Sequence, residues 1–211
     1  MTRRPKRWVA LGCAVGLLLG RVPLHAQELQ NPSFEQPMES GIWGSDRAAS
    51  WERLGGWFNR ETTWSPVFDG ECMLAYHHWQ IKQNEPSVVY QDIANVPTGK
   101  LYTFSIKTFK DKFTNAEFVE LRLEPFLGGA PLATNTYRMS NLKGGKWNEL
   151  SVTGMPVKAG VRVLVCVKPG RGSERKGALK FDQAAFTVRN QFPFGGGEVW
   201  RASSYGITRR Q

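Results

Sequence analysis

The sequence is poor in cysteine and lacks the short motifs that mark several common classes of enzyme. Three Cys in 211 residues are too few to build a disulfide scaffold. A mean hydropathy of −0.39 excludes a protein that crosses the membrane several times. We find neither a nucleophile elbow nor a phosphate-binding glycine loop ahead of a helix. The sequence therefore gives no sign of a serine hydrolase or of a nucleotide-binding enzyme.

Aromatic residues and turn-forming residues are plentiful. The chain has 12 Phe and 8 Trp, together with 22 Gly and 12 Pro. Gly and Pro favour turns and disfavour long helices. Hydrophobic residues make up 41% of the chain and charged residues 22%, which is a globular composition. The length suits one domain.

The N-terminus has the pattern of a secretory signal. Residues 3–7 read RRPKR, the run Trp8–Gly20 is uncharged and mostly apolar, and Leu24-His25-Ala26 resembles a cleavage site. We therefore predict a signal peptide over residues 1–26 and an exported protein, periplasmic or extracellular. The formal net charge of +10 then falls to +5, because this segment holds five cations and no acid.

Alternating apolar residues predict a series of short β-strands from about residue 27 to residue 189. Tyr102, Phe104 and Ile106 alternate with polar residues, and further alternating or apolar runs lie at 89–93, 119–123, 161–167 and 181–188. Strands at roughly ten-residue spacing indicate an all-β fold, an antiparallel sandwich or barrel. We expect residues 190–211 to form a C-terminal tail that is loosely held, folds back on the sandwich through its aromatic residues, or meets a partner through them.

Two features leave alternatives open. After loss of the signal, Cys72 and Cys166 either pair across two strands or stay separate as buried thiols. Several cations crowd a late segment, Lys168–Lys180. They either attract an acidic polysaccharide or an anionic surface, or form a solvated loop.

The order of short motifs resembles a known group of binding modules. The mature chain opens with Asn31-Pro32-Ser33-Phe34-Glu35. Trp57, Asp69-Gly70, Tyr90-Gln91, the segment Thr98–Ser105, Trp147 and Phe181-Asp182 follow in order. This arrangement is similar to the galactose-binding-like jelly rolls among carbohydrate-binding modules, especially families four, nine and twenty-two. The resemblance covers about residues 29–188 and implies an antiparallel β-sandwich jelly roll. Gln183 departs from the pattern, since it replaces the second Asp of the closing motif.

The resemblance implies a structural calcium ion that ties the first strand to the last. Glu35 and Asp182 are the matching carboxylates, and backbone carbonyls would complete the shell of oxygen ligands. The alternative is that both carboxylates accept hydrogen bonds from the backbone.

Two groups of residues are candidates for sugar binding. Aromatic rings stack on the C–H patches of pyranose rings, and four of them gather in the segment 57–79: Trp57, Trp64, Tyr76 and Trp79. Polar groups that bind hydroxyls share the non-core face of one strand: Glu120, Arg122 and Glu124. The alternative for the aromatic group is that its members fill the core.

We therefore predict an exported, non-catalytic carbohydrate-binding module that recognises a polysaccharide or glycan. Glu120 and Glu124 lie about 13 Å apart by strand rise, too far for the carboxylate pair of a glycosidase. The module would at most be an accessory to glycoside hydrolases. The alternative is a structural or cell-envelope interaction protein that binds a protein partner through the same sandwich. Nucleic-acid binding and a membrane span are not expected.

Overall fold

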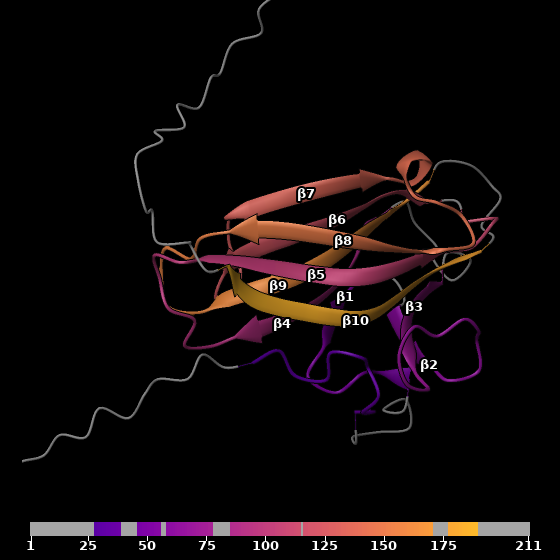
Figure 1. The fold of residues 1–211 in the computed structure, drawn as a ribbon, viewed down its shortest axis with the longest axis horizontal. Helices are drawn as coiled ribbons and strands as arrows, with labels where there is room; N and C mark the ends of the chain where they lie inside the picture. Colours follow the sequence, from indigo (N-terminus) through magenta and orange to yellow (C-terminus); the bar gives the residue numbers. More distant parts are fainter. Residues whose placement is uncertain are drawn as a thin grey trace, which may run out of the picture.

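The computed structural model describes residues 28–38, 46–55, 58–77, 85–114, 116–170 and 177–189. The predicted signal peptide and C-terminal tail lie outside these residues, and both stay predictions. The described residues form two five-stranded antiparallel sheets, which confirms the predicted β-sandwich jelly roll. Figure 1 shows the long strands side by side, with the N-terminal segment and β1–β3 along one flank.

The first sheet has the strand order β1-β4-β9-β6-β7. Its strands are β1 (Glu52–Leu54), β4 (Ser87–Ile93), β9 (Val161–Pro169), β6 (Ala116–Pro125) and β7 (Ala133–Arg138). The second sheet has the order β2-β3-β10-β5-β8. Its strands are β2 (Phe58–Glu61), β3 (Met73–His77), β10 (Ala178–Arg189), β5 (Leu101–Lys110) and β8 (Trp147–Gly154). A short 3-10 helix, η3 (Met139–Asn141), links β7 to β8.

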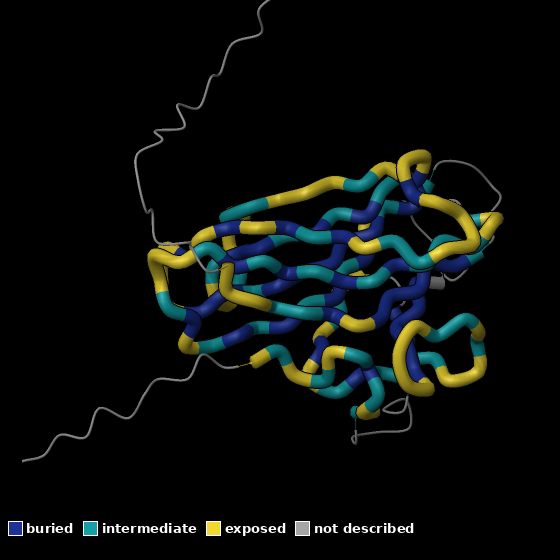
Figure 2. Tube along the Cα trace, viewed as in Figure 1, coloured by how far each residue is buried: buried dark blue, intermediate teal, exposed yellow. Residues whose placement is uncertain are grey.

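Strand alternation decides which side chains fill the core. Along β5 the even-numbered residues from Tyr102 to Thr108 are buried and their neighbours are half-buried. The strict period of two arises because successive side chains of a strand point to opposite faces of the sheet. Figure 2 shows the alternation as dark blue and teal bands along the long strands.

Aromatic residues from the second sheet and from the N-terminal segment pack in the core between the layers. The ring of Phe58 lies 5.5 Å from that of Tyr76 and 5.7 Å from that of Phe181, measured between centroids. Phe34 packs against Trp51 at 5.2 Å. The N-terminal segment also joins the last strand directly, since the Ala184 amide donates to the Pro32 carbonyl at 2.8 Å.

The two cysteines are separate. Cys72 precedes β3 and Cys166 lies in β9 of the other sheet, and both are buried free thiols. Of the two alternatives, the structure therefore has the unpaired one. No helix within the described ranges has the length and apolarity needed to cross a bilayer.

Candidate functional site

One outer face of the sandwich carries an array of charged side chains. In β6 the odd residues Val119–Leu123 are fully buried in the core, so Glu120, Arg122 and Glu124 point outward. The register places outward residues of neighbouring strands beside them: Arg162 of β9 is opposite both Glu124 and Asp92. We call this surface the polar face, and its members are Tyr90, Asp92, Phe118, Glu120, Arg122, Glu124, Thr134, Thr136, Arg162 and Lys168.

Arg162 is held in a fixed position on the polar face. Its Nε donates to Asp92 Oδ1 at 3.0 Å and its Nη2 to Asp92 Oδ2 at 2.8 Å, a bidentate pair. The guanidinium carbon lies 3.9 Å from the centroid of the Tyr90 ring. The hydrogen bond from Arg162 to Asp92 raises the pKa of this arginine, although burial opposes the shift. The three side chains therefore form one rigid unit across β4 and β9.

Arg122 links two carboxylates of its own strand. Its Nε donates to Glu120 Oε1, and its Nη1 lies 3.7 Å from Glu124 Oε1. The other Glu120 oxygen accepts a hydrogen bond from the Thr136 hydroxyl at 2.9 Å. Burial acts to lower the pKa of Arg122, but the hydrogen bond and the charge of Glu120 outweigh burial and raise it. The Arg122 side chain remains 34% exposed, so the network is open to a ligand.

The polar face presents donors and acceptors close together in a half-buried setting. Two guanidinium groups donate, three carboxylates accept, and the Thr136 hydroxyl does both. The side chains hold one another in place, so a ligand would not have to order them on binding. A sugar hydroxyl is both donor and acceptor, and vicinal hydroxyls match such alternating groups.

The structure brings one of the two predicted groups together and divides the other. Glu120, Arg122 and Glu124 lie side by side on the polar face, as their spacing indicates. Tyr76 is 0% exposed and packs against Phe58 in the core. Its predicted contact with a sugar is wrong, because its position in β3 turns the ring toward the second layer. Trp64 is half-buried in the loop between β2 and β3, in the other sheet. Trp57 and Trp79 lie outside the described residues.

Glu35 and Asp182 both hold the loop of residues 68–72. Asp182 Oδ2 accepts hydrogen bonds from the amides of Phe68 at 2.9 Å and Asp69 at 3.0 Å. Glu35 Oε1 accepts from the amides of Glu71 at 3.1 Å and Cys72 at 3.0 Å. We call this arrangement the carboxylate clasp. It joins the N-terminal segment, the loop and β10.

In the carboxylate clasp, the side chains of Glu35 and Asp182 both act as hydrogen-bond acceptors. Asp182 is 0% exposed, and its second oxygen accepts from the Gln183 amide at 2.7 Å. Burial raises the pKa of Asp182, and the three amide donors act against that rise. The N–H groups of these amides point at the oxygens of the Asp182 carboxylate. A cation that bound this carboxylate would have to approach the same oxygens. Within the described ranges, no three His, Cys, Asp or Glu residues gather as metal ligands. Calcium at Glu35 and Asp182 stays a prediction.

Solved structures share the fold of this chain. An arabinose-bound α-L-arabinofuranosidase, MgGH51, has a TM-score of 0.58 at 15% identity, over 77% of this chain and 26% of that one. The module TmCBM61, in complex with β-1,4-galactotriose, has a TM-score of 0.55 at 14% identity, over 78% of this chain and 100% of its own. A carbohydrate-binding module of the β-sandwich superfamily, studied for promiscuous specificity, has a TM-score of 0.50 at 11% identity, over 72% and 63%.

The chain has the β-sandwich fold of these structures. This confirms the fold that the motif resemblance implied. No family model matches the sequence, and no curated protein matches it. The chain spans only about a quarter of the arabinofuranosidase, 26% of its length.

Within this β-sandwich, sequence reasoning missed part of the polar face. It did not select Tyr90, Asp92 or Arg162 as site residues. A signal for them was present, because each alternates with core residues such as Val89, Ile93 and Val163. Polar or aromatic residues at the outward positions of neighbouring strands mark such a surface, but only the register shows which of them meet.

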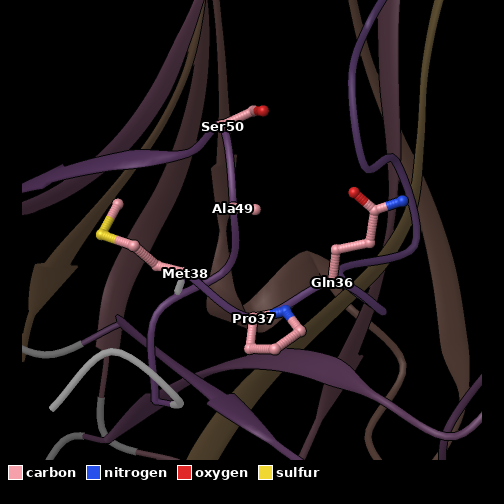
Figure 3. Close-up of a pocket in the computed structure, with 5 residues that line it drawn as sticks. All are labelled: Gln36, Pro37, Met38, Ala49 and Ser50. Atoms are coloured by element: carbon pink, nitrogen blue, oxygen red, sulfur yellow. The ribbon is translucent and has the colours of Figure 1, made fainter. Parts of the chain in front are cut away.

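A separate pocket lies beside the N-terminal segment of the sandwich. It has a volume of about 480 Å³ and is lined by Gln36, Pro37, Met38, Ala49 and Ser50. Figure 3 shows the five residues on two neighbouring stretches of chain, with Gln36 and Met38 pointing in opposite directions. The five described lining residues include no aromatic ring and no charged group. These five residues therefore offer a sugar fewer charged and aromatic contacts than the polar face does.

Proposed function

We propose that this chain is an exported, non-catalytic carbohydrate-binding module that binds a glycan on the polar face. The observation that carries the proposal is the network of Asp92, Arg162, Glu124, Arg122 and Glu120 on one half-buried face of a sheet. The fold is in accord with it, because TmCBM61 has this fold and was solved with β-1,4-galactotriose.

Apolar contact would come from rings next to the charged network. Tyr90 and Phe118 are half-buried on the polar face, and each has a cation near one side. A stacked pyranose ring would contribute on the order of 1–3 kcal/mol through buried apolar area. Trp57, Trp64 and Trp79 remain the aromatic candidates from the sequence. The polar side chains would fix the orientation of the sugar.

The same geometry supports binding without hydrolysis. A glycosidase holds a sugar bond between two carboxylates that face each other across it. Glu120 and Glu124 instead project from one strand, and Arg122 lies between them with a contact to each. The Arg122 side chain therefore occupies the space between the two carboxylates. Such a module would be an accessory to a glycan-degrading enzyme.

A glycan array probed with residues 27–211 tests the proposal. We expect binding to at least one glycan, and a loss of roughly tenfold in affinity for Arg122→Gln, because the guanidinium joins the two carboxylates. The matched control is Lys107→Gln, which also removes a cation from an ion pair, with Glu149, but on the outer face of the other sheet. Trp79→Ala tests aromatic stacking in the same assay.

Two results would count against this proposal. A folded sample that binds no glycan would favour the structural or protein-partner alternative. Equal losses for Arg122→Gln and Lys107→Gln would show that the bound glycan does not lie on the polar face.

A further inference from the structure

Cations gather at one end of the sandwich. The segments that meet there are residues 110–114, 116–117, 138–147, 168–170 and 177–180, and η3 marks this end in Figure 1. Together they hold seven cations against two acids, Asp111 and Glu117. We call this surface the basic end, and its cations are Lys110, Lys112, Arg138, Lys143, Lys146, Lys168 and Lys180. By contrast, the described residues from 28 to 77 hold three cations against seven acids.

Four of these cations face solvent without an anionic partner among the described carboxylates: Lys112, Arg138, Lys143 and Lys146. The other three are engaged, since Lys110 donates to the Met139 carbonyl at 2.8 Å, Lys168 pairs with Glu117 at 3.3 Å, and Lys180 lies 3.6 Å from Asp111. Beside Lys112, Phe113 is 66% exposed. The surface therefore has unpaired positive charge next to an apolar ring.

The loop that carries Lys143 and Lys146 is held in place by protein contacts. The Asn148 amide group donates to the carbonyls of Lys143 at 3.1 Å and Lys146 at 2.9 Å, and its oxygen accepts from the Lys143 amide. The Gly145 amide donates to the Lys110 carbonyl at 3.0 Å. The loop backbone is thus fixed while the two lysine side chains stay free to contact a ligand.

The basic end is continuous with the polar face. Phe118 of β6 is opposite Lys168 of β9 and Arg138 of β7 in the register. Two residues further along β6 is Glu120, the first carboxylate of the polar face. A polymer that lies along β6 and β9 would pass from the carboxylates of the polar face to the cations of the basic end.

We propose that the basic end binds carboxylate groups of an acidic polysaccharide whose neighbouring sugars occupy the polar face. The inference rests on the proposed function and names its substrate class, a polysaccharide that contains uronic acids. Sugar carboxylates pair with Lys112, Arg138, Lys143 and Lys146, while hydroxyls contact the carboxylates and guanidinium groups of the polar face.

The mixed charge of the surface favours a polysaccharide over a nucleic acid. A phosphate backbone carries negative charge at every unit. Along the same path it would meet Glu120, Glu124 and Asp92, which repel it. A polysaccharide places many neutral hydroxyls between its carboxylates, so it satisfies both parts of the surface.

Binding of polygalacturonate to residues 27–211 tests the inference. The variant Lys112→Gln/Lys143→Gln/Lys146→Gln removes three exposed charges of the basic end. Its matched control, Lys100→Gln/Lys158→Gln/Arg189→Gln, removes three exposed charges at the opposite end. At low salt we expect the first variant to lose roughly tenfold in affinity and the second less than about twofold. Binding of the wild type should weaken as salt is added.

Binding of two further polymers, a neutral β-1,4-galactan and a single-stranded DNA, is measured in the same way. Arg122→Gln should weaken binding of the polymers that occupy the polar face, and the variant of the basic end should weaken only the acidic one. The inference is overturned if polygalacturonate does not bind, or if the two triple variants lose affinity equally. It is also overturned if DNA binds as tightly as polygalacturonate at an equal concentration of charged groups. The proposed function fails separately, if Arg122→Gln changes nothing.

Discussion

Cys166 is an uncharged thiol on a strongly charged surface. It lies on the outward side of β9, between Val88 and Glu120 in the register, and is 3% exposed. Its pKa is raised from 9.0 to about 11, mainly by burial; Arg122 acts to lower it, and Glu120 and Glu124 act to raise it. At neutral pH the thiol is therefore protonated and a poor nucleophile.

This pKa predicts how stability depends on alkaline pH. An unfolded chain releases the thiol proton near pH 9, while the folded chain keeps it until about pH 11. The folded state therefore binds more protons in this window, and stability falls as pH rises through it. Urea unfolding measures the free energy of unfolding at pH 8 and at pH 10.5. Between these two pH values it should fall by about 2 kcal/mol less in Cys166→Ala than in the wild type. An equal loss in both proteins would contradict the assigned pKa.

Single residues also show what sequence alone can predict about the site. The outward positions of Glu120, Arg122 and Glu124 were predictable, because clear core residues lie between them. The position of Tyr76 was not, because in β3 four consecutive residues, Met73–Tyr76, are buried and no alternation is visible. Pairs such as Asp92 with Arg162 are 70 residues apart in sequence and need the register.

At the scale of elements, the carboxylate clasp holds the 68–72 loop over the second sheet. Asp182 lies beside a register shift in β10, and the next residue, Gln183, has a φ of 44°. Gly70 in the loop has a φ of +69°, and a Cβ there would lie 2.3 Å from Glu35 Oε1. The loop places Phe68 against Trp147, with ring centroids 5.4 Å apart.

We predict that the clasp depends on its hydrogen bonds. Asp182→Asn puts an amide group where three backbone amides donate, and should lower the free energy of unfolding by about 1–3 kcal/mol. The matched control is Asp69→Asn, because exposed Asp69 accepts only a 3.1 Å bond from Ser33 among the bonds of this loop. Urea unfolding measures both. A chelator separates the two alternatives for Glu35 and Asp182: a lower melting temperature of the wild type on chelation supports bound calcium, and an unchanged one supports hydrogen bonds alone.

The elements differ in how well the sequence predicts them. Strands β4, β5, β6, β9 and β10 were predicted, because each alternates or is strongly apolar over seven residues or more. Strands β1 and β2 have only three and four residues, too few to show a period of two. Exposed β7 has few apolar residues and gives no amphipathic pattern. These strands form because the neighbouring strand pairs with them.

At the scale of the whole molecule, the sheets join strands that are far apart in sequence. β1 pairs with β4, β4 with β9, and β3 with β10. The first sheet needs β9 and the second needs β10, so neither sheet is complete until the C-terminal strands have formed. Each sheet also buries one face in the same core. Charge is unequal along the chain as well, because the turns of the basic end hold seven cations against two acids, while the described residues from 28 to 77 hold three against seven.

We predict that the two sheets unfold as one unit. Leu121→Ala in the first sheet and Phe104→Ala in the second each remove a fully buried side chain, and each should cost about 2–5 kcal/mol. Leu54→Ala, at a position that is 57% exposed, is the control and should change little. Urea unfolding followed by circular dichroism and by tryptophan fluorescence should give coincident transitions for every variant. Separate transitions would mean that one sheet folds without the other. That result is not expected, because a sheet that loses its partner exposes the whole apolar face that the core now covers.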